Sequence, residues 1–152
     1  MPTSLADLTL VTATLGAGLI AGLCFTFASV VMTALDGLGA PAALRAMQSI
    51  NAVILRSVAM PVWIGTALVA VVATVLAEER LAVGTPAALY LLGALAVTRA
   101  GNIPLNEALD RVDPEAPDAV RAWADYRRRW GRWNTLRTVL CGLACAGFAL
   151  AR

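Results

Sequence analysis

A long stretch without any charged residue constrains this chain more than any other feature. The 28 residues between Asp7 and Asp36 carry no charge, and one crossing of a bilayer takes about 20 apolar residues. A secretory signal peptide would be shorter and would follow a basic residue, whereas this stretch follows Asp7. We therefore predict a transmembrane helix near residues 8–35 that remains in the mature protein.

Three further apolar segments follow the first. Uncharged runs cover residues 57–77, 81–98 and 138–151, and the apolar pattern carries the last two across Arg99 and Arg137. Of the 152 residues, 59% are apolar and only 14% are charged, against roughly 25% charged in soluble domains. This composition argues against a soluble globular enzyme. We predict an all-α integral membrane four-helix bundle, with a short helix leading into the second span and an amphipathic extension before the fourth. The predicted spans of this single 1–152 domain are 8–35, 53–77, 81–106 and 133–151.

The charged connections predict the topology. Glu78, Glu79 and Arg80 form a tight turn, so the second and third helices should make an antiparallel hairpin. The two longer connections then share the opposite face, and they hold eight of the 12 basic residues, all of which are Arg. Since basic residues favour cytoplasmic loops, we expect these connections in the cytoplasm, both termini outside, and the bacterial inner membrane as the location. The net charge of +2 indicates no nucleic-acid partner.

Polar residues inside the predicted spans recur at helical spacing. Arg99, Asn102 and Asn106 follow at i, i+3 and i+7, and Asn134 and Arg137 lie three apart on the last helix. A charged group at membrane depth costs about 2.5 to 3.5 kcal/mol, so we expect these residues to share one pocket in the cytoplasmic half. The other residues expected around it are Phe25, Ser29, Met32, Asn51, Trp130 and Trp133. In the alternative, the Arg side chains extend to the interface and the Asn side chains only join helices.

The chain contains no His and only three Cys. The lack of His removes the commonest metal ligand and the commonest general base. Cys141 and Cys145 are four apart on one helix, where a disulfide would be strained. We therefore predict no metal site and treat the cysteines as packing residues.

Four segments together resemble a known family. They are GLCFTFASVVMTAL (22–35), MQSIN (47–51), NIPLNEAL (102–109) and WADYRRRWGRWNTLRT (123–138). In this combination and order the chain is similar to the anthrone oxygenase-like small membrane proteins, over nearly its whole length. The resemblance implies a four-helix membrane bundle. It also implies an activity found in some members, which oxidises anthrones to anthraquinones with O2 and without a known cofactor.

The resemblance implies a lipophilic aromatic or polyketide substrate and a site that fits its chemistry. An anthrone must lose a methylene proton, and the resulting oxyanion needs preorganised donors. We expect Trp130 and Trp133 to stack on the ring, and either Glu107 or Asp36 to accept the proton. The residues predicted to be catalytic are Arg99, Asn102, Asn106, Glu107, Asn134 and Arg137.

Two other functions stay open at this stage. The first is a non-enzymatic membrane protein that binds a small molecule or acts as an accessory subunit. The second is a membrane cyclase or isomerase that uses the same pocket on a lipophilic intermediate. In each case the expected partners are the lipid bilayer and a lipophilic small molecule, and assembly into a homo-oligomer is left open.

Overall fold

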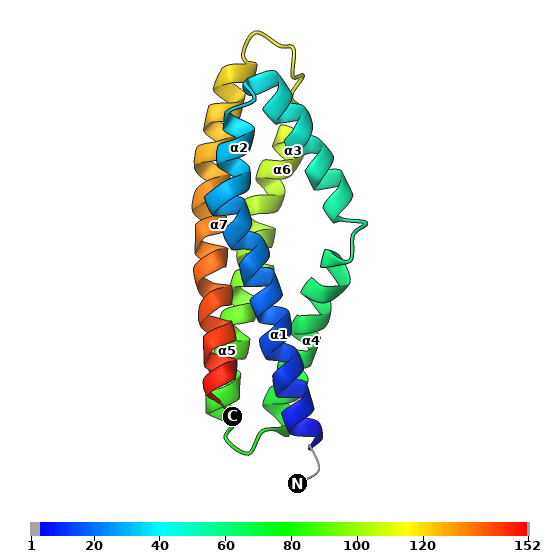
Figure 1. The fold of residues 1–152 in the computed structure, drawn as a ribbon, viewed down its shortest axis with the longest axis vertical. Helices are drawn as coiled ribbons and strands as arrows, with labels where there is room; N and C mark the ends of the chain where they lie inside the picture. The colour runs from blue at the N-terminus through cyan, green and yellow to red at the C-terminus, as the bar shows by residue number, and fades with distance from the viewer. Residues whose placement is uncertain (1–3, 152) are drawn as a thin grey trace.

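The structure is a computed structural model that describes residues 4–151, and that part of the chain is helical with no strand. Long helices run side by side along the longest axis (Figure 1). The elements are α1 (Leu5–Thr26), the π-helix η1 (Phe27–Val31), α2 (Met32–Asp36), α3 (Ala40–Ile54), α4 (Ala59–Leu76), α5 (Arg80–Tyr90), the π-helix η2 (Leu91–Asn102), α6 (Ile103–Leu109) and α7 (Ala119–Leu150). The predicted all-α class is confirmed.

The first three elements form one continuous helix from Leu5 to Asp36. Ser4 and Asp7 make a capping box at its start, which satisfies backbone N–H groups that the first helical turn leaves free. The helix ends before Gly39, whose φ of 80° lies in the left-handed region that glycine adopts most easily. A short turn there reverses the chain into α3.

The second predicted span is divided into two helices. α3 extends over 15 residues to Ile54, and α4 begins at Ala59. Pro61 lies in the first turn of α4, where its missing N–H breaks no hydrogen bond. The chain therefore bends at residues 55–58, before the proline, and α3, with 15 residues, is the helix expected to lead into this span.

The third long helix changes its hydrogen-bonding pattern midway. α5, η2 and α6 run without a break from Arg80 to Leu109, but the 12 residues of η2 are π-helical. π-Helical turns are rare and are often found at functional sites. η2 gives way to α6 at Ile103, and Pro104 falls in the first turn of the new helix.

Helix α1 packs closely on α4 and on α7 through small residues. A Cβ atom on Gly16 of α1 would lie 2.0 Å from Oγ1 of Thr66 on α4, so only glycine permits this approach. One apolar core lies in this half of the bundle and includes Ala13, Ala17, Ala70, Tyr90 and Phe148. A second core, in the half near α2 and α3, includes Met32, Leu44, Met47, Trp123 and Trp130.

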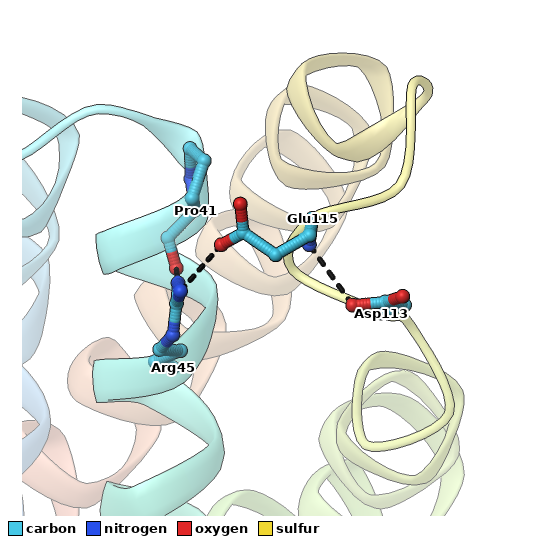
Figure 2. Close-up of polar contacts among 4 residues, drawn as sticks. All are labelled: Pro41, Arg45, Asp113 and Glu115. Carbon is cyan, nitrogen blue, oxygen red and sulfur yellow. Dashed lines mark hydrogen bonds and ion pairs between the residues drawn. The ribbon is translucent and has the colours of Figure 1, made fainter.

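Polar contacts hold α3 against the connection between α6 and α7. Arg45 of α3 forms an ion pair with Glu115, whose backbone N–H donates to Oδ1 of Asp113 at 2.9 Å (Figure 2). Nε2 of Gln48 donates to two backbone carbonyls in the turn after α6, at 2.9 and 3.0 Å. These contacts fix the half of α3 that precedes Asn51.

The membrane prediction is supported by three helices. Leu5–Asp36, Ala59–Leu76 and Arg80–Leu109 are long and apolar enough to cross a bilayer. α1 begins and α7 ends at the same end of the bundle as the turn between α4 and α5 (Figure 1). The fourth span, which would lie in α7, stays a prediction.

Candidate functional site

A partly open cavity of about 450 Å³ lies where the two apolar cores meet. Side chains from α1, η1, α3, α4, η2, α6 and α7 line it. Most of its surface is apolar, and its polar lining residues are Asn51, Thr98, Arg99, Asn102, Asn106, Asn134 and Arg137. The structure thus brings the Asn and Arg residues of three separate segments to one cavity, as their helical spacing predicts.

Arg137 is the charged residue at the centre of this arrangement. Its side chain is only 6% exposed. Nη1 donates to Oγ1 of Thr98 at 3.2 Å, and Nη2 donates to Oδ1 of Asn134 at 2.6 Å. Within the described residues, no carboxylate forms an ion pair with it. A buried cation without a counter-ion is costly, so the surrounding neutral groups must stabilise it.

Two indole rings contribute to that stabilisation. The guanidinium carbon Cζ of Arg137 lies 5.4 Å from the centroid of Trp63 and 5.5 Å from that of Trp130. Both distances fall within the range of cation–π attraction. Nε1 of Trp63 donates to the backbone carbonyl of Ala94 at 2.9 Å, which fixes this indole against η2. The guanidinium is therefore held between aromatic faces from α4 and α7.

Asn134 connects the charged group to the first helix. It is fully buried, and its Nδ2 donates to the backbone carbonyl of Cys24 at 2.8 Å while its Oδ1 accepts from Arg137. An amide can act as donor and acceptor at once. Asn134 thus orients the guanidinium and joins α7 to α1.

Four buried polar atoms around the cavity have no hydrogen-bond partner within the described residues. They are Nδ2 of Asn51, Oδ1 of Asn102, Nε1 of Trp130 and Nε of Arg137. All four residues line the cavity. A buried polar group without a partner costs about 1 to 3 kcal/mol, and native folds rarely keep several together. Their concentration at one cavity is typical of a site that a ligand completes.

Arg99 and Asn106 mark the edge of the site. Arg99 lines the cavity but is exposed, so it stands at the rim. Oδ1 of Asn106 accepts from the hydroxyl of Tyr126 at 3.0 Å. Nδ2 of Asn102 donates to the backbone carbonyl of Trp130 at 3.4 Å. The two asparagines therefore join α6 and η2 to α7 and also contribute to the lining.

Three residues expected from the first helix lie elsewhere. Phe25 is 60% exposed, Ser29 is exposed, and Met32 is buried in the second core. Phe25 lies in α1, where the buried residues Ile20 and Cys24 mark the inward face, and the three-and-four spacing of that face continues to Phe27 and not to Phe25. Phe27 lines the cavity from this segment, with its ring centroid 5.7 Å from that of Trp130.

Trp133 also lies outside the cavity lining. Its side chain is 38% exposed and covers Gly101, where a Cβ atom would approach the indole to 2.3 Å. It packs on the outer surface of η2, so we do not assign it to ligand binding.

Neither acidic residue expected to act as base reaches the cavity. Glu107 is exposed and does not line it. Asp36 forms an ion pair with Arg127 at 2.9 Å and accepts from Nε1 of Trp123 at 3.1 Å. Within the described residues, the cavity lining contains no Asp or Glu.

The sequence reasoning missed Trp63 and Thr98. Neither belongs to a polar stripe, and Thr98 is unremarkable at the end of an uncharged run. Trp63 did carry a signal, because it is the sole aromatic residue of the run over residues 57–77. An indole within a span needs an acceptor for its N–H, which points to an inward position.

The exposed lining residues mark where the cavity opens. Leu55, Ile64 and Leu95 line it and are also exposed, with Ile64 on α4 and Leu95 on η2. α4 packs on α1 and α5 and is more separated from η2. The cavity therefore opens sideways, between α4 and η2, through a mouth of aliphatic side chains with Arg99 at its rim.

The comparisons with curated proteins and with solved structures gave no match. A family model described as anthrone oxygenase matches residues 45–147, which is more than half of the chain. The match extends from α3 to near the end of α7 and includes every polar residue of the cavity lining. Of the four segments that carry the resemblance, residues 22–35 lie before the matched range. The chain belongs to the anthrone oxygenase family.

Proposed function

We propose that this protein is a membrane-embedded oxidoreductase that binds a flat lipophilic aromatic substrate of the anthrone type and oxidises it with O2. The observation that carries the proposal is the position of Arg137, which is buried between two indoles beside an apolar cavity and has no carboxylate partner among residues 4–151. A site of this kind suits a planar molecule on which negative charge develops at oxygen. The family match supports the same substrate class.

The proposed reaction balances without another oxidant. Loss of one methylene proton converts the anthrone to its enolate, which reacts with O2 and takes up a proton to give a hydroperoxide at the former methylene carbon. Loss of the remaining hydrogen at that carbon and cleavage of the O–O bond then release water and leave a carbonyl group. One oxygen atom of O2 enters the quinone and the other leaves as water.

The residues of the cavity would contribute to this reaction as follows. Arg137, oriented by Asn134, stabilises the enolate oxygen. Asn51 and Trp130 each offer an unpaired N–H group to the ligand. The indoles of Trp63 and Trp130 would lie against the flat ring. Preorganised donors of this kind each contribute about 100- to 1000-fold to a rate in other enzymes.

We propose the following membrane arrangement. The single domain has four spans, with α7 supplying the fourth through its apolar half. The long connections lie in the cytoplasm and both termini lie outside, in a bacterial inner membrane, because Arg residues concentrate in those connections. A reporter that is active only in the cytoplasm should be silent when fused after Arg152. Activity of that reporter would show that the proposed orientation is wrong.

A second candidate function rests on one observation. The cavity lining contains no His, Asp or Glu within the described residues, so no side chain there is an ordinary general base. A protein that binds a lipophilic molecule without changing it would need none. This candidate predicts tight binding of anthrone without turnover.

Turnover in lipid nanodiscs distinguishes the two functions. Purified protein is mixed with anthrone under 18O2, and quinone formation above the protein-free rate is followed by absorbance and mass spectrometry. We expect one labelled oxygen in the quinone, and a rate at least about 100-fold lower for Arg137→Gln. The matched control is Arg132→Gln, which changes an exposed Arg of the same helix. A rate equal to the protein-free rate, or full activity of Arg137→Gln, would refute the proposal.

A further inference from the structure

The charges around the cavity do not balance. Arg137 is buried, while the carboxylates that form ion pairs in the described residues are bound by other Arg side chains. Asp36 pairs with Arg127, and Glu115 pairs with Arg45. The cavity lining adds a second Arg at its rim and no acid. The cavity therefore has a net positive charge that the protein itself does not neutralise.

The unpaired atoms show an excess of donors. Three of the four are N–H groups, on Asn51, Trp130 and Arg137, and one is the amide oxygen of Asn102. Donors without acceptors need a ligand with oxygen lone pairs. Together with the positive charge, they fit an oxygen anion better than a neutral carbonyl, because hydrogen bonds to charged groups are about twice as strong.

The remaining lining selects the kind of anion. Indole faces cover the guanidinium at 5.4 and 5.5 Å, and aliphatic residues such as Ile50, Ile54 and Leu95 surround the rest of the cavity. A compact anion would lose its hydration there without compensation. An aromatic oxyanion spreads its charge over the ring and buries apolar surface, so it satisfies both parts of the lining.

We propose that the cavity selects the ionised form of its ligand, a phenolate or enolate, and that the proton is released to the medium when the ligand binds. This inference rests on the proposed aromatic ligand and adds its charge state. It also removes the need for a base, because the cavity stabilises the anion and no lining carboxylate has to receive the proton. A nearby positive charge lowers the pKa of an acid by about 1 to 3, and the bound ligand should show a shift of this size.

The test uses 2-hydroxyanthraquinone, whose absorption moves to longer wavelength when it loses its phenolic proton. The probe is titrated with pH in nanodiscs of zwitterionic lipid, with the protein and without it. We expect the pKa of the bound probe to be lower by about 1 to 3 than in protein-free nanodiscs. 2-Methoxyanthraquinone, which has the same ring system with one added methyl group and cannot ionise, should bind at least about tenfold more weakly.

Variants assign the effect to the buried charge. Arg137→Gln should abolish the shift, Arg137→Lys should retain part of it because the charge remains, and the exposed Arg132→Gln should behave as the unmodified protein. Circular dichroism and gel filtration in detergent test whether each variant is folded. If Arg137→Gln does not fold, two measurements still test the inference. They are the partial pKa shift expected in Arg137→Lys and the weaker binding of the methoxy ligand to the unmodified protein.

Each outcome separates this inference from the proposed function. An unshifted pKa for a bound probe, or equal binding of the methoxy ligand, overturns the inference and leaves oxidation of a neutral substrate possible. A shifted pKa without any turnover of anthrone supports the inference and overturns the proposed oxidation. The aliphatic anion dodecanoate and a second aromatic oxyanion are compared as competitors of the probe. If dodecanoate displaces the probe equally well, the aromatic part of the proposal is overturned.

Discussion

Replacing Arg137 by methionine should leave the stability of the protein nearly unchanged while removing anion binding. The substitution keeps a long side chain and deletes the charge. In the proposed fourth span, a guanidinium costs about 2.5 to 3.5 kcal/mol. Two hydrogen bonds, at about 0.6 kcal/mol each in membranes, and two cation–π contacts, at about 0.5 to 1 kcal/mol each, offset most of that cost.

Methionine removes both the cost and the compensating contacts. Oδ1 of Asn134 loses its donor, which costs about 1 kcal/mol. The expected change in the free energy of unfolding therefore lies within about 1 kcal/mol of zero. For the ligand, opposite charges about 4 Å apart attract by about 4 kcal/mol at an effective dielectric constant of 20. Affinity for an aromatic oxyanion should accordingly fall at least about 100-fold.

Steric trapping in bicelles measures the unfolding free energy, and absorbance titration with 2-hydroxyanthraquinone measures binding. Arg132→Met is the matched control, and it should change neither quantity because Arg132 is exposed. A loss of stability above about 3 kcal/mol would refute the reasoning, because it would mean that Arg137 mainly holds helices together. An unchanged affinity of Arg137→Met for 2-hydroxyanthraquinone would also refute the reasoning.

Three further predictions concern helix packing, the position of α3 and the candidate base Glu107. Gly16→Ala should destabilise the bundle by about 1 to 3 kcal/mol because its Cβ meets Thr66, and adding Thr66→Ala should recover part of the loss in thermal unfolding; additive losses would contradict this contact. Gln48→Leu removes two hydrogen bonds from α3 and should speed hydrogen exchange over residues 40–54, whereas unchanged exchange would show that other contacts hold α3. Glu107→Gln should retain oxidation of anthrone, because this side chain is exposed and does not line the cavity; abolished turnover would make Glu107 the base.

Regular helical periodicity correctly predicts the cavity-lining residues of η2 and α6. Arg99, Asn102 and Asn106 lie on one face at any spacing near 3.6 residues, and the structure places all three at the cavity despite the π-helical pattern of η2. Glu107 shows the limit of adjacency. It follows Asn106 directly, but successive helical residues point about 100° apart, so its side chain is exposed.

Other features of the site depend on information that a pattern does not carry. The π-helical turn of η1 is one such feature. No periodic signal marks such a turn. That no carboxylate of the described residues pairs with Arg137 is likewise a property of the folded arrangement, since the chain has ten acidic residues that could have paired with it.

The aliphatic mouth between α4 and η2 affects how affinity must be measured. Ile64 and Leu95 lie within helices that are apolar enough to cross a bilayer, so in the proposed membrane arrangement a ligand that enters past them would dissolve first in lipid. Occupancy then follows the mole fraction of ligand in the bilayer, rather than its concentration in water. Adding empty vesicles at fixed total ligand should dilute it and lower occupancy. Two substrates that fit equally well would compete according to how strongly each partitions into the membrane.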